Sequence, residues 1–260
     1  MLIFFVLCKN KFLISILNFQ FLIFNCQSVS VLHCPNGFHS LDLSLPVKCY
    51  AKTMAERTNK YYHLDLINEN CAGKYDMPVI RRQEIQPTKE LLSFHLATSH
   101  KRKDVGVHFF LDDYQFERVW RRPWKYIEVL KDFPFVLSPG FSLYIDMPLA
   151  MKIWNNWRRQ FVAEYWQRNG LTVVPTVMWA EERTFQFCFD GIEPGGAIAV
   201  STQGPAMSKR GRECWCKGMR EALRRLQPTT ILHYGQPIDF DFGNTEVVYY
   251  ENPIIKRLRK

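Results

Sequence analysis

Residues 197–234 read AIAVSTQGPAMSKRGRECWCKGMREALRRLQPTTILHY, and this stretch decides the fold class. Its first six residues begin with four apolar ones and are of the kind found in buried strands. A turn at Gly204 follows, then a helical stretch over 212–226 that stops before Pro228, and a second apolar run over 229–234 that ends at Gly235. A strand, a helix and another strand in this order predict two parallel strands with the helix packed on their sheet.

The same alternation continues on both sides of this unit. Apolar runs predict further strands over residues 105–111, 133–138, 171–179 and 247–250, and helical spacing predicts helices over 114–120, 124–131, 147–169 and 181–189. Because the strands are almost continuously apolar, we expect the sheet to be buried on both faces. The sequence therefore predicts an α/β fold with a mostly parallel sheet and flanking helices. Both a doubly wound sheet and a partial (β/α) barrel fit this pattern.

Chain length and composition predict one domain with an extension. The protein has 260 residues, of which 47% are hydrophobic and 23% charged, and this is the composition of a globular protein. Residues 1–53 are interpreted as an N-terminal extension outside the native domain, and residues 54–260 as a single α/β domain. A domain of this size needs no disulfides, so we expect reduced thiols in a cytoplasmic protein at Cys71, Cys188, Cys214 and Cys216. The Cys-x-Cys spacing of the last two predicts no structural zinc site.

The N-terminal segment differs in composition from the rest of the chain. It is rich in Phe, Leu, Ile, Asn and Lys, and it contains an apolar run from Phe12 to Phe24. A signal peptide would lack a clear cleavage site here, and a membrane span needs about 20 apolar residues, more than this run offers. The third interpretation, which we favour, is that translation starts at Met54 and that the preceding segment is encoded upstream of the natural gene. We expect no stable membrane association of the domain itself.

Four segments resemble a known protein family. They are FFLDDYQFER at 109–118, SPGFSLYIDMP at 138–148, FCFDGI at 187–192 and AVSTQG at 199–204. Together they are similar to a bacterial and phage domain-of-unknown-function family (number four-four-one-seven), over roughly residues 60–250. The resemblance implies a small standalone protein of phages, mobile elements and bacteria, and it brings no established activity. The family pattern has Asp where this chain has Gly140, and a catalytic role for that acid would leave this member impaired.

Carboxylates follow the ends of two predicted strands. Asp112 and Asp113 come directly after the run at 105–111, and Asp146 follows the run at 133–138. Because α/β folds bind ligands at the carboxyl ends of their strands, these three are candidate catalytic residues. They could form an acid–base pair, and Asp112 and Asp113 could hold a divalent metal ion as cofactor. Helix capping is the alternative, and it accounts for Asp at all three positions.

Candidate substrate-binding residues lie along the same predicted edge. They are Ser138, Tyr144, Trp179, Ser201 and Thr202. The loop STQG at 201–204 joins a strand to a helix, where backbone N–H groups can hold a phosphate. It lacks the glycine spacing and the lysine of a P-loop, and an ordinary strand-to-helix turn is the alternative.

Basic and aromatic side chains alternate on the longest predicted helix. Arg158 and Arg159 lie among Trp154, Trp157 and Trp166. Basic side chains that follow phosphates and rings that stack on bases are typical of nucleic-acid binding, so the two arginines are candidate substrate contacts. The alternative is an amphipathic helix with an aromatic inner face and a basic outer face. His108 and His233 lie on predicted buried strands and are expected to be core residues.

Two hypotheses about function remain. The net charge of +9 favours nucleic acid or another acidic ligand as partner. The basic tail at 256–260 supplies four of these charges and is expected to be a solvated terminus. The first hypothesis is an enzyme that acts on a nucleic-acid or phosphate-containing substrate, and the second is a non-catalytic nucleic-acid- or protein-binding module. Convergence of the three aspartates and Ser201 on one pocket would favour the enzyme. A flat, positive surface would favour the binding module.

Overall fold

The computed structural model describes residues 3–8, 11–16 and 56–252. The chain divides into two compact units, Met1–Asp65 and Leu66–Lys260. In the first, β1 (Ile3–Cys8) and β2 (Lys11–Ile16) form an antiparallel hairpin, and residues 56–61 are helical. Most of the apolar run, the proposed start at Met54 and the basic tail lie outside the described residues, so the expectations about them stay predictions. In the described ranges, no helix has the length and apolar character that crossing a membrane requires.

Seven parallel strands of the second unit follow one another in chain order. One sheet has the order β5 (Leu91–Ser93), β6 (Gly106–His108), β7 (Val136–Leu137) and β8 (Val173–Val174). A second has β10 (Thr230–Tyr234) between β9 (Ala197–Ser201) and β11 (Glu246–Tyr250). A parallel bridge between Thr176, two residues after β8, and Ala199 of β9 links the two sheets. This confirms the predicted α/β class with mostly parallel strands.

The predicted strand at 171–179 is shorter than expected because of Pro175. Proline has no N–H to donate, so regular pairing stops at Val174. The chain then passes to its next neighbour, where the Ala199 N–H donates to the Pro175 carbonyl at 2.9 Å and the Val177 N–H donates to the Ala199 carbonyl at 2.8 Å. One apolar run thus contacts both sheets.

The strands curl into a partial (β/α) barrel. Alternate strand residues point to opposite faces, and a separate buried cluster collects the inward-facing ones. Its members come from β7 to β11 and from the residue before β7: Phe135, Leu137, Val174, Ala197, Ala199, Leu232, Tyr234 and Tyr250. The Tyr250 hydroxyl of β11 donates to the Thr88 carbonyl, just before β5, at 2.8 Å. No strand ladder joins β11 to β5 in the described part of the chain, so the barrel is not closed. Strands in chain order favour the barrel over the doubly wound alternative.

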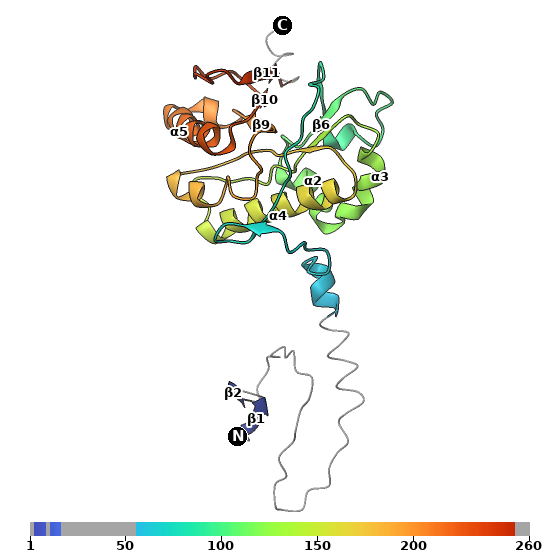
Figure 1. The fold of residues 1–260 in the computed structure, drawn as a ribbon, viewed down its shortest axis with the longest axis vertical. Coiled ribbons are helices and arrows are strands. Elements are labelled where there is room, and N and C mark those ends of the chain that lie inside the picture. The colour runs from blue at the N-terminus through green and yellow to red at the C-terminus, as the bar shows by residue number, and fades with distance from the viewer. Residues whose placement is uncertain (1–2, 9–10, 17–55, 253–260) are drawn as a thin grey trace, which may run out of the picture. The chain divides into compact units, whose positions relative to one another are not determined.

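Helices cover the outer face of the strands. They are α2 (Asp113–Arg121), α3 (Ile127–Leu130), α4 (Leu149–Arg168) and α5 (Lys209–Leu226), with the 3₁₀ turns η1 (Phe94–Leu96), η2 (Pro123–Tyr126), η3 (Glu182–Gln186) and η4 (Pro205–Met207). Figure 1 shows α2, α3 and α4 grouped on one side of the strands and α5 next to β9 and β10. A small antiparallel pair, β3 (Cys71–Ala72) and β4 (Met77–Pro78), contacts α4.

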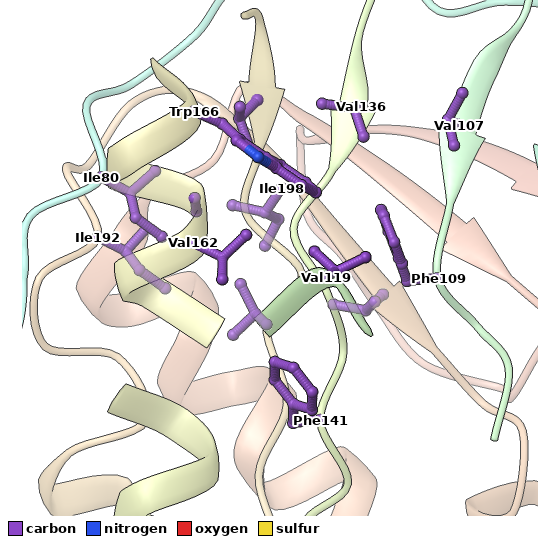
Figure 2. Packing of buried hydrophobic residues seen from close by; sticks show 14 of the residues in the cluster. Ile80, Val107, Phe109, Val119, Val136, Phe141, Val162, Trp166, Ile192 and Ile198 are labelled. Carbon is purple, nitrogen blue, oxygen red and sulfur yellow. The ribbon is translucent and has the colours of Figure 1, made fainter. Parts of the chain in front are cut away.

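The main core lies between the strands and α4. In Figure 2, Val162 and Trp166 of α4 face the outward side chains Val136 and Ile198 of the strands. Trp166 is fully buried, and its indole N–H donates to the Pro123 carbonyl at 2.9 Å. Burying each such side chain stabilises the fold by about 1.5–3 kcal/mol, so this layer holds the helices in place.

Two helix ends show how well local sequence signals performed. Gly170 follows α4 with φ +89°, a left-handed conformation that glycine adopts without strain and that commonly ends a helix. The predicted cap at Asp146 is wrong, because α4 begins at Leu149 after Pro148 and receives no side-chain cap. The fixed φ of proline is already suited to a helix start. Asp146 is therefore exposed in the preceding loop.

Candidate functional site

A cavity of about 1130 Å³ lies at the carboxyl ends of the strands. The last residues of β5, β6, β9 and β10 all line it: Ser93, His108, Ser201 and Tyr234. The residues that follow β6, the loop at 140–146, the segment after β8 and the start of α5 also line it. This is the position of the active site in (β/α) barrels and open α/β sheets.

Half of the residues predicted from the sequence line this cavity. They are Asp112, Tyr144, Asp146, Trp179 and Ser201. The other half lie elsewhere: Asp113, Ser138, Thr202, Arg158 and Arg159. The first group brings two carboxylates, a phenol, an indole and a hydroxyl to one hollow. The second group is engaged inside the fold.

The adjacent acids Asp112 and Asp113 have different surroundings. Asp112 precedes α2, makes no side-chain capping bond and is exposed on the cavity wall. The Asp113 carboxylate accepts a hydrogen bond from the Ser142 backbone N–H at 3.0 Å and one from the Ser142 hydroxyl at 2.7 Å. Asp113 therefore holds the loop that carries Tyr144 and Asp146.

Ser138 and Thr202 tie strand ends together. The Ser138 hydroxyl accepts from the Thr176 N–H at 2.8 Å, and the Thr176 hydroxyl donates to the Ser138 carbonyl at 2.7 Å. The Thr202 hydroxyl donates to the Gln236 carbonyl at 2.6 Å. Both predicted residues are fully buried, and their hydroxyls are used by neighbouring backbone.

The arginines of α4 are likewise engaged within the fold. Arg158 donates to Glu117 of α2 at 2.8 Å, and its guanidinium lies 3.8 Å from the centre of the Phe141 ring. Arg159 is buried and donates to the side chain of Asn156. Burial lowers the pKa of Arg159 to about 10. Neither guanidinium lies on an open surface where a nucleic-acid backbone would pass.

His108 and Tyr234 form the floor of the cavity. Their ring centres are 4.7 Å apart, and the Phe110 ring lies 4.7 Å from Tyr234 at an interplanar angle of 20°. His108 is 3% exposed and Tyr234 4%. Burial, with a smaller contribution from His95, lowers the pKa of His108 to about 3, and burial raises the pKa of Tyr234 to about 12. Both rings are therefore neutral at physiological pH.

The sequence did not predict a role for β5. Its last residue, Ser93, has its hydroxyl oxygen 3.1 Å from Nδ1 of His95, and both residues line the cavity. A hydroxyl paired with an imidazole is the arrangement that activates a serine nucleophile. β5 has only three residues, too few to show a strand pattern, so no sequence signal marked these two.

The start of α5 adds positive charge to the wall. The Ser208 hydroxyl caps the helix by accepting from the Gly211 N–H at 3.0 Å, and Arg210 is exposed on the cavity wall. Helix N-termini carry partial positive charge, which favours anions. The Cys214 thiol donates to the Ala180 carbonyl at 2.8 Å, and burial raises its pKa, so it is a protonated wall residue at neutral pH.

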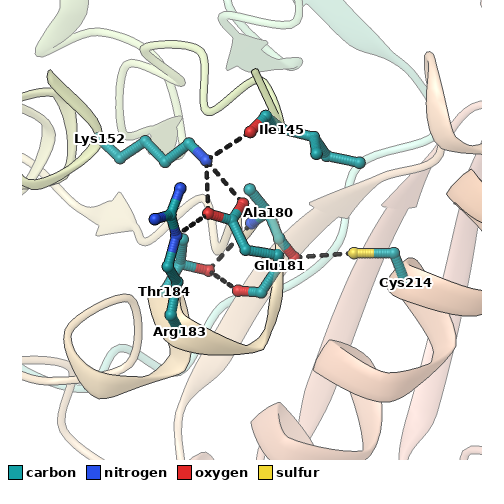
Figure 3. Close-up of polar contacts among 7 residues, drawn as sticks. All are labelled: Ile145, Lys152, Ala180, Glu181, Arg183, Thr184 and Cys214. Carbon is teal, nitrogen blue, oxygen red and sulfur yellow. Dashed lines mark hydrogen bonds and ion pairs between the residues drawn. The ribbon is translucent and has the colours of Figure 1, made fainter. Parts of the chain in front are cut away.

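A buried ion pair joins two walls of the cavity (Figure 3). Lys152 of α4 is fully buried, and its ammonium group donates to both Glu181 carboxylate oxygens, at 2.7 and 2.6 Å, and to the Ile145 carbonyl at 2.8 Å. Arg183 also donates to Glu181. Burial raises the pKa of Glu181, but the bonds from Lys152 and Arg183 outweigh it and bring the pKa to about 2. The pair fixes the loop before α4 against the segment after β8.

Comparison with known proteins identifies the family. The profile of a family described as "Domain of unknown function (DUF4417)" matches residues 69–251. The chain belongs to this family. It is 39% identical over 168 residues to the "Gene 1 protein" of Mycobacterium phage L5. This alignment covers 64% of this chain and 73% of the phage L5 protein. It is 43% identical over 168 residues to the "Gene 1 protein" of Mycobacterium phage D29, covering 64% of this chain and 62% of that protein. No solved structure matches the chain.

These matches confirm the resemblance that the four sequence segments carried. They place the chain in a family of unknown function, with relatives in two mycobacteriophages. Gly140, where the family pattern led us to expect Asp, lies on the cavity wall with Met178 and Thr176 close by. In the described ranges, no three His, Cys, Asp or Glu side chains gather into a metal-binding group.

Proposed function

We propose that this protein is a cytoplasmic enzyme that acts on a nucleotide or another phosphate-containing substrate in the cavity at the strand ends. The observation that carries the proposal is the convergence of Asp112, Asp146 and Ser201 on one cavity, with Arg210 on the same wall. Carboxylates supply acid–base chemistry, and an exposed guanidinium binds phosphate oxygens. Five of the ten residues selected from sequence meet there, which supports the enzyme over a flat binding surface.

The roles divide by position. Asp112 and Asp146 are exposed carboxylates, suited to accept a proton or to hold a divalent cation together with substrate phosphate oxygens. Asp113 is occupied by Ser142, so a cation at Asp113 would have to displace those bonds. Arg210, next to the partial positive charge at the start of α5, is placed to attract the phosphate. The loop from Ser201 to Gly204 leads into that helix.

The test is turnover of a substrate panel by the full chain. Nucleoside mono-, di- and triphosphates and a labelled single-stranded oligonucleotide are incubated with and without Mg²⁺ or Mn²⁺, and products are separated by chromatography. We expect Asp146→Asn to lower turnover by about 100-fold, as loss of an acid–base group does. Asp132→Asn, an exposed acid outside the cavity, is the matched control and should keep full activity. The proposal would be overturned if no member of the panel were turned over and none were bound.

A second function is favoured by the outer face of α5. Lys209, Arg212 and Arg220 are exposed on this helix and lie outside the cavity lining, in a chain of net charge +9. Such a face would bind nucleic acid without catalysis, and affinity would fall as salt rises because counterions are released. Replacing Lys209 and Arg220 by Gln should reduce the slope of log affinity against log salt concentration by about two phosphate contacts, as measured by fluorescence anisotropy. A salt-independent affinity would contradict this second function.

A further inference from the structure

The floor of the cavity holds two polar atoms that have no protein partner. His108 and Tyr234 are both more than nine-tenths buried, yet both line the cavity. In the described part of the chain, His108 Nε2 and the Tyr234 hydroxyl make no hydrogen bond, and neither atom is sealed from solvent. Buried polar groups are almost always paired. Two that open onto one cavity, with their rings in contact, point to a ligand that pairs with them.

The protonation state of the pair defines what it can bind. Nδ1 of His108 accepts the Phe110 N–H at 3.1 Å, so it keeps its lone pair and the single proton of the neutral ring is on Nε2. His108 therefore offers a donor to the cavity, and the neutral phenol of Tyr234 offers a second. Two uncharged donors suit an uncharged acceptor such as a carbonyl oxygen. A phosphate would lose its hydration there without gaining a charged partner, whereas Arg210 provides one on the wall.

The surroundings of the pair define the shape of the group. Phe110 and Tyr234 are stacked rings, and Leu91 of β5 also lines the cavity. Aromatic side chains beside hydrogen-bond donors favour a planar heterocycle over an aliphatic chain. A volume of about 1130 Å³ has room for a nucleotide. We infer that the His108–Tyr234 floor binds the ring carbonyl of an oxo-base, so that the substrate is an oxo-purine or oxo-pyrimidine nucleotide. The phosphate half of this inference rests on the proposed function.

The test compares two nucleotides that differ at one position. Inosine 5′-monophosphate has a carbonyl where adenosine 5′-monophosphate has an amine, and an amine cannot accept from His108. Calorimetry on the full chain should show inosine monophosphate binding about tenfold tighter or more, since two hydrogen bonds differ. Tyr234→Phe, which removes only the hydroxyl, should weaken inosine monophosphate about three- to tenfold and leave ribose 5-phosphate unchanged. In the wild type, the His108 Nε2–H resonance should shift on addition of inosine.

The outcomes separate the two proposals. Equal binding of both nucleotides and of ribose 5-phosphate, with no effect of Tyr234→Phe, overturns the carbonyl site and leaves the phosphate site standing. Binding of inosine but not of ribose 5-phosphate, with weakening by Tyr234→Phe, keeps the carbonyl site and removes the phosphate substrate. Absence of binding by every probe overturns both. Circular dichroism of Tyr234→Phe confirms that the variant is folded.

Discussion

Replacing Glu181 by Gln should destabilise the protein more than replacing its partner Lys152 by Met. Glu181→Gln leaves the Lys152 ammonium group, which is 0% exposed, without a carboxylate. Breaking a buried pair in this way costs about 3–5 kcal/mol, and we expect about 3 because the Glu181 side chain is 27% exposed and water screens part of the interaction. Lys152→Met removes the buried charge itself and fills its volume. Glu181 then keeps Arg183 and water, so we expect a cost of about 1 kcal/mol.

The assay is urea unfolding at pH 7, followed by tryptophan fluorescence. The double variant Lys152→Met with Glu181→Gln should be more stable than Glu181→Gln alone, because it contains no unpaired buried charge, and the coupling between the sites should be about 2 kcal/mol. The stability that ionised Glu181 contributes to the folded protein is fully present above pH 4.5, the ordinary pKa of a glutamate. It is lost as the pH falls through about 2, the pKa of Glu181 in the folded protein. A loss of stability in Lys152→Met equal to or larger than that in Glu181→Gln would refute the reasoning.

Three further predictions concern the interior. Burial lowers the pKa of His233 from 6.5 to about 4, so the stability that its neutral ring contributes is fully present above pH 6.5 and falls by up to about 3 kcal/mol towards pH 4. Burial lowers the pKa of His108 in the same way, so thermal unfolding of His233→Phe should lose the His233 part of the pH dependence and keep the His108 part. Gly106→Ala should cost about 2 kcal/mol or more in urea unfolding, since its Cβ would lie 2.3 Å from the Phe135 ring, and an unchanged midpoint would contradict that contact. Tyr250→Phe removes the bond to Thr88 and should cost about 1 kcal/mol, with faster hydrogen exchange in β11 as the local readout.

Local patterns predicted the order of elements well. The apolar runs at 105–111, 197–202 and 229–234 became β6, β9 and β10, because continuous apolar stretches bounded by turn residues have few other ways to be buried. β5 was missed because three residues carry no periodicity. The barrel curvature was also beyond local signals, since the Tyr250–Thr88 bond joins residues 162 positions apart.

The site was harder to predict than the strands, for a related reason. In each strand, alternate residues point to opposite faces of the sheet. The set that faces the barrel interior depends on the register of the strand and on how far the sheet curls. His108 was interpreted as a core histidine, and its burial agrees with that, but its free nitrogen opens on a cavity to which β6 and β10, far apart in the sequence, both contribute. Burial and a binding role are compatible when the buried atom has no partner.

The two neighbouring aspartates show how far sequence reasoning reaches. Both follow the same strand, so their position in the sequence does not show which of the two is the better catalytic candidate. The helix start separates them: Asp112 lies before α2, exposed on the cavity wall, whereas Asp113 is the first residue of α2 and bonds Ser142, 29 positions away. Asp113→Asn should therefore act through the loop that carries Asp146, raising KM as the cavity wall loosens, whereas Asp112→Asn should lower kcat with the wall intact. If both variants changed KM and kcat in the same way, the two acids would have the same role and this distinction would be wrong.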